Sequence, residues 1–316
     1  MALKLADRWI WDSWYVWDGD VCHAFYLCAS KGLGDPNRRH RYTSVGHAIS
    51  KDLVEWEVLP DALAPSDSPA FDSWTTWTGS VVRDETGLWW MFYTGTSRED
   101  GGNIQSVGAA TSKDLITWTK LSSNSLVEAD PEFYELYSPE IWHDQAWRDP
   151  WVFQREDGFW HMLVTARSHQ GNPKTRGVIG HARSRNLKEW HVLKPLSVPG
   201  NDFGQLEVFQ YEVVDGVPVV IFCCGWREIS EERQARQGKI DYTYSIAGDP
   251  LQENLNFAKA TPFVELPVYA GRLVRHPAKG WHLIGFWNEV NGDFQGYLSD
   301  PMPVTASIDK GLIPRI

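Results

Sequence analysis

Short apolar segments of strand length recur along the chain, and a turn glycine stands shortly before each of them. Helical periodicity is nearly absent. The one polar stretch that fits a short helix is 228–237, which fits a solvated loop equally well. Successive turn glycines are 58 to 71 residues apart, which predicts a repeating unit built of strands. These glycines are Gly19, Gly87, Gly158, Gly216 and Gly280.

A second marker runs in phase with the glycines. The pattern Ser-Lys-Asp-Leu-x-x-Trp occupies residues 50–56 and 112–118, and a weaker copy occupies 184–190. Two degraded copies follow at 245–251 and 299–302. Each unit therefore reads as a short strand, a glycine turn, an apolar strand, a looser strand and this edge motif.

Four strands per unit, repeated five times, predict an all-β fold: a five-bladed β-propeller with four antiparallel strands per blade. The alternative is a two-sheet sandwich with accidental similarity, which five in-phase units disfavour. We expect a single domain over residues 1–316, since no Pro/Gly/Ser-rich linker divides it. A late strand or the N-terminal segment should complete the last sheet, because an unpaired edge invites aggregation. The expected inner strands lie near 10–17, 78–83, 149–154, 206–211 and 271–276.

Carboxylates gather on the strands expected to line the central channel. Counting nine residues back from the turn glycines reaches Ile10, Thr78, Asp149, Glu207 and Gly271, so blades three and four carry acids at this position. In blade one, Asp12 stands seven back, on the same side of the pleat. Three like charges in one funnel push their pKa values apart, as catalysis by an acid and a nucleophile requires. The alternatives are structural acids, or a funnel that binds a sugar or a cation.

Composition narrows the classes of function. The formal net charge of −11 argues against nucleic acid and anionic membrane surfaces as partners. No apolar run is long enough to span a bilayer and the start lacks a signal-type core, so we expect a soluble, cytoplasmic protein. We expect no cofactor and no metal site, because neither paired metal-ligand spacing nor a phosphate-binding loop is present. The four cysteines read as buried thiols, and most of the 18 tryptophans as packing between sheets.

Four segments on successive inner strands together resemble a known family. They read Trp-Asp-Ser-Trp at 11–14, Trp-Thr-Gly-Ser at 77–80, Trp-Arg-Asp-Pro at 147–150 and Gln-Leu-Glu-Val at 205–208. These look like the signature segments of the furanosidase propellers of glycoside hydrolase families 32 and 68, which include invertases and levansucrases. The resemblance covers about residues 7 to 300.

The resemblance implies a retaining mechanism. Asp12 would be the nucleophile, Glu207 the acid/base and Asp149 the transition-state stabiliser. It further implies a role in substrate binding for four residues. Trp11 and Trp77 would wall the sugar pocket, Ser80 would donate to Asp12, and Arg148 would contact acids and hydroxyls.

The resemblance therefore implies an exo-acting glycosidase that cleaves a terminal β-D-fructofuranosyl unit from sucrose or short fructo-oligosaccharides, by hydrolysis or by transfer. One alternative is an inverting arabinofuranosidase or xylosidase similar to family 43. Another is a non-catalytic sugar-binding propeller. Family 32 members usually carry a C-terminal β-sandwich, which we do not expect here because the chain ends soon after the fifth blade. The oligomeric state, the leaving group and a structural calcium are not readable from the sequence.

Overall fold

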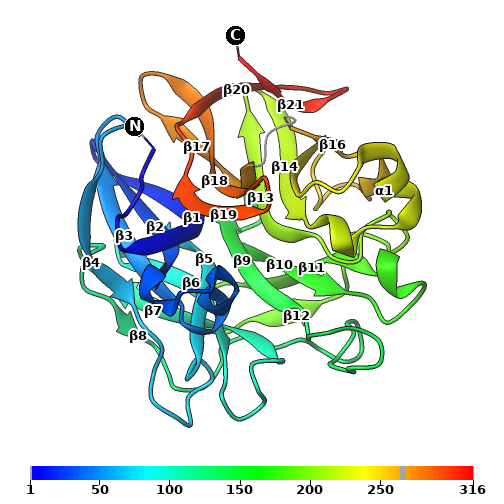
Figure 1. Ribbon diagram of the computed structural model, residues 1–316, viewed down its shortest axis with the longest axis horizontal. Coiled ribbons are helices and arrows are strands. Elements are labelled where there is room, and N and C mark those ends of the chain that lie inside the picture. Colours follow the sequence, from blue (N-terminus) through cyan, green and yellow to red (C-terminus); the bar gives the residue numbers. More distant parts are fainter. Residues whose placement is uncertain (1, 264–267, 316) are drawn as a thin grey trace.

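The computed structural model describes residues 2–263 and 268–315, and it places five antiparallel sheets around a common centre (Figure 1). Colours run in order around the ring, so each sheet is one stretch of chain. The first strand of each sheet contacts the first strands of the neighbouring sheets, which makes it the innermost strand. The predicted all-β five-bladed propeller and its five inner strands are confirmed.

The blades have the following strands. Blade one consists of β1 (Arg8–Asp18), β2 (Val21–Ser30), β3 (Ser44–Ser50) and β4 (Glu57–Leu63). Blade two consists of β5 (Thr75–Arg83), β6 (Trp89–Thr96), β7 (Gln105–Ser112) and β8 (Thr119–Lys120). Blade three consists of β9 (Trp147–Gln154), β10 (Trp160–Arg167), β11 (Gly177–Ser184) and β12 (His191–Leu193). Blade four consists of β13 (Glu207–Val214), β14 (Val217–Cys224), β15 (Tyr242–Ala247) and β16 (Thr261–Pro262).

Blade five closes the ring with late strands. Its order is β17 (Val268–His276), β18 (Gly280–Val290), β20 (Met302–Ser307) and β21 (Gly311–Pro314), and β19 (Asp293–Leu298) also pairs with β18. The N-terminal segment packs there too, since the Leu298 amide donates to the Leu3 carbonyl at 3.0 Å. The expected completion by a late strand is confirmed. Within the described residues, no β-sandwich follows.

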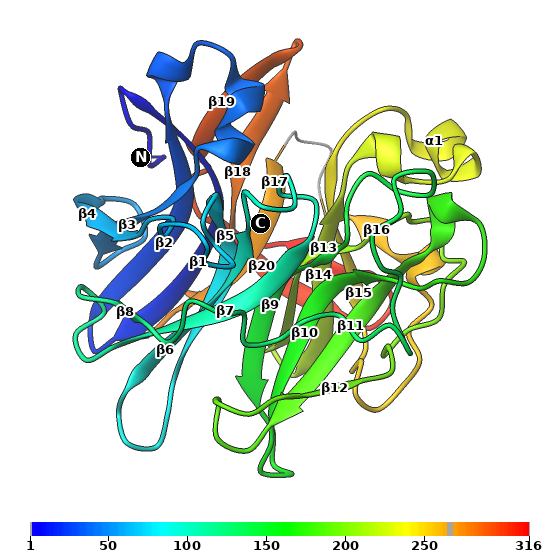
Figure 2. The same ribbon diagram turned by 90° about the horizontal axis from the view of Figure 1, so that it is seen from below.

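Helical structure is confined to short segments between strands. The polar stretch noted above forms a helix, α1 (Glu231–Gln237), because the Ser230 hydroxyl accepts from the Arg233 amide and caps its first turn. The 3₁₀ turns are η1 (Lys31–Leu33), η2 (Pro36–Arg41), η3 (Pro173–Thr175), η4 (Trp226–Glu228) and η5 (Phe257–Lys259). In Figure 2, η2 and α1 lie on one face of the ring, and the hairpin turns of blades two and three project from the other. No helix in the described residues is long and apolar enough to cross a membrane.

The Ser-x-Asp-Leu-x-x-Trp motif, with Asn186 in place of the aspartate in blade three, forms the turn between the third and fourth strands of blades one to three. In blade two, the Asp114 carboxylate accepts from the Ile116 and Thr117 amides, at 2.9 and 2.8 Å. Leu115 adopts a left-handed φ of 62° and is fully buried. The Trp118 ring then meets Phe25 of blade one edge-on, at 5.6 Å. The repeated motif therefore packs neighbouring blades against each other.

All four cysteines are free and buried, as expected.

Candidate active site

A cavity of about 480 Å³ opens at the face that carries η2 and α1. Its lining includes Asp12, Asp149, Glu207, Arg148 and both predicted tryptophans. Each of the five inner strands contributes at least one lining residue, so the cavity is one mouth of the central channel. The structure thus brings together six of the seven predicted site residues.

Every inner strand carries a β-bulge at the level of this cavity. The pairing with the second strand slips between Ile10 and Ser13, between Trp77 and Gly79, between Arg148 and Trp151, between Glu207 and Gln210, and between Tyr269 and Arg272. A bulge leaves an extra residue unpaired and re-aims side chains, which is why bulges occur beside active sites. In blades three to five the first bulge residue has a left-handed φ, at Asp149 (58°), Val208 (55°) and Ala270 (47°). The sequence pattern did not reveal these bulges.

The bulges correct one part of the sequence analysis. Glu207 is still paired, opposite Cys223, whereas Asp149 is the first residue of its bulge and Asp12 the second of its own. The three acids therefore occupy three successive positions of a shared backbone feature, not equivalent ones. Counting from the turn glycine failed because the turns differ in length. Two residues separate the last paired positions of the first two strands in blade four, whereas five residues separate them in blade three.

Asp12 is held by Thr78, not by Ser80. The Thr78 hydroxyl donates to Asp12 Oδ2 in a short hydrogen bond. The Ser80 hydroxyl is buried and instead accepts from the Val152 amide of blade three at 3.1 Å. Ser80 lies two residues further along β5, roughly 7 Å below the level of the cavity. The expectation that Ser80 donates to Asp12 is wrong, and Thr78 was missed in that role.

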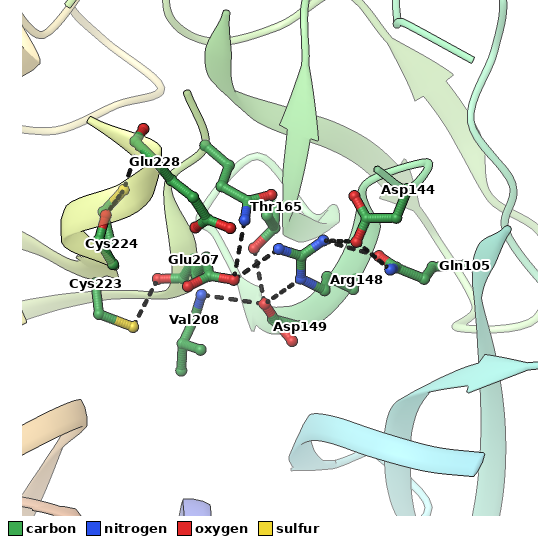
Figure 3. Close-up of polar contacts among 12 residues, drawn as sticks. Gln105, Asp144, Arg148, Asp149, Thr165, Glu207, Val208, Cys223, Cys224 and Glu228 are labelled. Atoms are coloured by element: carbon green, nitrogen blue, oxygen red, sulfur yellow. Dashed lines mark hydrogen bonds and ion pairs between the residues drawn. The ribbon is translucent and has the colours of Figure 1, made fainter. Parts of the chain in front are cut away.

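Glu207 is clamped by donors on both of its oxygens. Arg148 Nη2 lies 2.6 Å from Glu207 Oε1, Gln205 Nε2 donates to the same oxygen at 3.4 Å, and the Tyr269 hydroxyl donates to Oε2 at 2.5 Å. Figure 3 shows the Arg148 guanidinium between Glu207 and Asp144, whose Oδ2 lies 3.4 Å from Nη1. Both oxygens of Glu207 are thereby fixed in direction.

Asp149 is the most deeply enclosed of the three acids. Its Oδ2 accepts from the Thr165 hydroxyl at 2.8 Å and from the Val208 amide at 3.3 Å, and Arg148 Nε lies 3.5 Å away (Figure 3). Burial raises the pKa of Asp149 to about 7; Arg148 opposes this shift, and the charges of Asp12 and Glu207 add to it. Burial also raises the pKa of Asp12, against the hydrogen bond from Thr78. The cluster thus retains a proton near neutral pH.

A further wall of the cavity comes from η2, between β2 and β3. The Trp77 indole Nε1 donates to the His40 carbonyl at 2.9 Å, and the His40 ring meets Trp11 and Trp77 edge-on, at 6.1 and 6.5 Å. Arg39 and His40 also line the cavity. Blades three and four also carry helical turns between their second and third strands, but with different sequences, so the repeat pattern did not single out His40.

Two further acids line the cavity from the segment that carries η4 and α1. Burial raises the pKa of Glu228 to about 8, reinforced by the charge of Glu207. Burial also raises the pKa of Asp241, whose carboxylate accepts from the Trp226 amide at 2.8 Å. In the part of the chain that the structure describes, no group of His, Cys, Asp and Glu side chains is arranged to hold a metal ion.

Comparison with known proteins places the fold and cavity in a family. The family model of the glycosyl hydrolases family 32 N-terminal domain matches residues 15–298, and the chain belongs to this family. The match begins three residues after Asp12, so the place of Asp12 in the cavity rests on the structure.

Curated relatives match part of the chain. Identity is 37% over 155 residues with sucrose-6-phosphate hydrolase of Zymomonas mobilis, covering 48% of this chain and 27% of that protein. It is 34% over 167 residues with sucrose-6-phosphate hydrolase of Bacillus subtilis, covering 52% and 30%. It is 34% over 177 residues with an insoluble β-fructofuranosidase of Arabidopsis thaliana, covering 54% and 26%. The alignments thus span less than a third of these relatives' own length.

Solved structures share the fold over nearly the whole chain. The Bombyx mori family 32 β-fructofuranosidase superposes with a TM-score of 0.75 at 18% identity, covering 99% of this chain and 64% of that one. Fructan 1-exohydrolase IIa of Cichorium intybus gives 0.74 at 20%, covering 99% and 59%. Levansucrase of Bacillus subtilis gives 0.74 at 14%, covering 97% and 86%. At these identities the likeness concerns the fold.

Proposed function

We propose that the chain is a retaining, exo-acting glycosidase that removes a terminal β-D-fructofuranosyl unit from sucrose or short fructo-oligosaccharides. The observation that carries the proposal is the convergence of Asp12, Asp149 and Glu207 in one cavity. The cavity volume of about 480 Å³ suits a small ligand. Family membership and the names of the curated relatives support the same reaction. Among the structural neighbours, one holds sucrose and another 1-kestose.

The proposed chemistry has two steps. A carboxylate oxygen of Asp12 bonds to the anomeric carbon while the glycosidic bond breaks, and protonated Glu207 gives its proton to the leaving oxygen. Glu207 then takes a proton from water, and the hydroxide displaces Asp12 from the sugar. A sugar hydroxyl in place of water gives transfer. Both partial steps pass through an oxocarbenium-like state that nearby carboxylate charge stabilises.

Substrate binding has to move a proton within the cluster. Burial raises the pKa of Asp149 to about 7, and the charges of Asp12 and Glu207 add to this shift. Ring hydroxyls that donate to Asp149 stabilise its ionised form, which releases its proton. Glu207 takes up a proton before it protonates the leaving oxygen. The acids therefore titrate as one coupled unit.

The walls suit end-on entry of a sugar. Trp11 and Trp77 offer apolar faces on one side, and Arg148 offers donors for hydroxyls on the other. The narrowing ring of inner strands closes the cavity below, so only a terminal residue reaches the acids. The charged rim around η2 and η4 gives room for one or two further sugar units. We therefore expect sucrose-sized substrates to react faster than long fructans.

A reducing compartment is also part of the proposal. All four cysteines are free and buried, which is typical of cytoplasmic proteins. Fractionation of the source cells with a compartment marker tests this location. Recovery of the protein only outside the cytoplasm would contradict it.

One experiment tests the activity. The chain is incubated separately with sucrose, sucrose 6-phosphate, 1-kestose, a long fructan, and aryl arabinofuranosides and xylosides, and the released sugar is identified. We expect fructose from sucrose or its phosphate and from the trisaccharide. Release of arabinose or xylose alone would instead indicate an inverting furanosidase or xylosidase. No release from any substrate would favour a sugar-binding role.

A further inference from the structure

A fully buried arginine lies below the cavity floor, outside the lining residues. Arg272 is the first residue after the bulge of β17, and only 1% of its surface is exposed. Its Nη1 donates to the carbonyls of Phe209, in a short bond, and of Val208, at 3.4 Å. Its Nη2 donates to the Gly79 carbonyl at 3.5 Å. The guanidinium therefore connects the bulges of three inner strands: β5, β13 and β17.

This cation has no formal ion pair. Its hydrogen-bond acceptors are carbonyl oxygens, one face of the guanidinium packs over the Trp151 ring at 5.1 Å, and Nε has no partner among the described residues. Burial of an unpaired charge costs several kcal/mol, so a neighbouring opposite charge is needed to offset it. The carboxylates of Asp12 and Asp149 supply that charge, because the bulges that Arg272 joins also hold these two acids. The Val208 amide donates to Asp149 Oδ2 at 3.3 Å, and Thr78, the neighbour of Gly79, donates to Asp12. Both acids also interact electrostatically with Arg272.

We propose that Arg272 is the counter-charge of the catalytic carboxylates, a positioning residue that favours the ionised form of Asp12 and so sets the acid limb of the pH profile. The inference rests on the proposed role of Asp12 as nucleophile. Its logic is electrostatic: the three predicted catalytic acids lie in one cavity, and Arg148, the cation that contacts Glu207 and Asp149, is also engaged by Asp144. A second cation below the floor offsets the repulsion that remains.

Other charged and titratable groups also face Asp12. Glu207 adds repulsion from blade four, and Arg39 adds attraction from η2. Cys223 of β14, whose pKa is raised by burial, interacts with the same acids. Tyr15 of β1, whose pKa is likewise raised by burial, interacts with Arg272. Both stay neutral over the acid range, so Arg272 and Arg39 are the cations that act on Asp12.

The test uses Arg272→Gln, which removes the charge, and Arg272→Lys, which keeps it but loses the forked geometry. Arg233→Gln is the matched control. Arg233 is also buried, donates to carbonyls (Ala258 and Ala260), and packs over an aromatic ring (Phe203, 4.3 Å), but it lies on α1, where its ion-pair partner is Asp202 at 3.6 Å and not an acid of the catalytic cluster. For each full-length variant, kcat/KM for the substrate that the wild type cleaves is measured against pH, and Tm is measured over the same range.

In Arg272→Gln the pKa of Asp12 rises further, so the acid limb of the kcat/KM profile should move to higher pH by about one unit. At pH values below the limb, this shift lowers kcat/KM about tenfold. Arg272→Lys should lower Tm and leave the limb in place. Arg233→Gln should lower Tm with no shift. An unmoved limb in Arg272→Gln, or an equal shift in Arg272→Lys, would show that Arg272 is only a clamp between blades.

Stability gives a readout that does not depend on activity. The lost charge matters only while the acids are ionised, so the Tm deficit of Arg272→Gln should shrink as the pH falls and the acids protonate. The deficit of Arg233→Gln should change less over the same range. A pH-independent deficit in Arg272→Gln would overturn the inference, even if the chain cleaved no fructoside. Absence of wild-type activity alone would overturn only the proposed function.

Discussion

Left-handed backbone recurs in two regions of the propeller, and the regions differ in which residues adopt it. At the outer turns of blades one to three, the left-handed residue is leucine each time, with φ values of 68°, 62° and 63° at Leu53, Leu115 and Leu187. At the inner bulges of blades three to five, the left-handed residues differ from blade to blade: Asp149, Val208 and Ala270.

The difference separates stability from function. The outer turns of blades one to three pack in the same way, so their residue types recur together with their backbone. The inner bulges share a backbone that aims side chains into the channel, while each blade supplies a different group to one asymmetric site. A change at a bulge should therefore affect activity, and a change at an outer turn should affect stability.

The largest effect is expected for Asp12→Asn. The amide keeps the shape but cannot form the covalent intermediate, so kcat for sucrose should fall at least about 10³-fold, with retained sugar binding. Steady-state kinetics and calorimetry measure both. Asp18→Asn, an exposed acid at the end of the same strand, is the control and should keep its activity. Near-full activity in Asp12→Asn would assign the nucleophile elsewhere.

Glu207→Gln should show the next largest effect. Loss of the proton donor should lower kcat for sucrose by about 10²- to 10⁴-fold, and a fructoside whose leaving group needs no proton should recover the first step. The comparison of kcat on sucrose and on an aryl fructoside measures this selectivity. Glu212→Gln, further along β13, is the control. Equal losses on both substrates would argue against an acid role.

Leu115→Ala tests the outer turn. Removal of this buried side chain should destabilise the fold by about 2–5 kcal/mol, because a cavity opens between blades one and two. Denaturant unfolding measures the loss, and kcat of the folded fraction should stay at the wild-type value. Ile116→Ala, at the exposed neighbouring position, should cost little. A drop in kcat without a drop in stability would break the separation of the two regions.

Two histidine pairs in the outer parts of blades one and three should give a smaller, pH-dependent effect. His23 and His47 lie 3.0 Å apart between ring nitrogens, as do His161 and His181. Burial lowers the pKa of His47 and of His181 to about 3. A histidine whose pKa is lower in the folded than in the unfolded chain stabilises the fold at pH values above its unfolded pKa of about 6.5. This contribution to the free energy of unfolding is lost as the pH falls towards 3.

Urea unfolding at pH 7.5 and pH 5 should therefore show a loss of up to about 2 kcal/mol for each of these two histidines, since 1.4 kcal/mol accompanies each pH unit. His47→Phe removes one titrating group and should flatten the dependence. The same slope in wild type and variant would show that the pair does not titrate with folding.

Several features were predictable because they repeat or because a charge stood out in an apolar strand. The phase of the turn glycines located all five inner strands, and the acids at 12, 149 and 207 do line one cavity. The bulges were not predictable, because a one-residue slip in strand pairing leaves the alternation of side chains between the two faces of the sheet intact on either side of it. That slip is why Thr78, and not Ser80, contacts Asp12.

Other site residues gave no sequence signal for different reasons. His40 lies in the segment between the second and third strands, whose sequence differs from blade to blade, so repeat comparison could not place it. Glu228 begins a polar segment that fits a short helix and a solvated loop equally well, and only the tertiary fold turns it towards Glu207. Arg272 interrupts an apolar strand, where it looks like any basic residue. Its role depends on carboxylates from other blades.

In the proposed mechanism, Asp12, placed by its bulge, attacks the anomeric carbon of the sugar. The most direct test treats Glu207→Gln with an activated β-fructofuranosyl donor, denatures it rapidly and sequences the modified peptide by mass spectrometry. Without the base, the second step slows and the intermediate accumulates. We predict one fructosyl group on the peptide that contains Asp12, and none in the Asp12→Asn, Glu207→Gln double variant. A fructosyl group on another acid, or turnover of the donor with no covalent intermediate, would contradict the account.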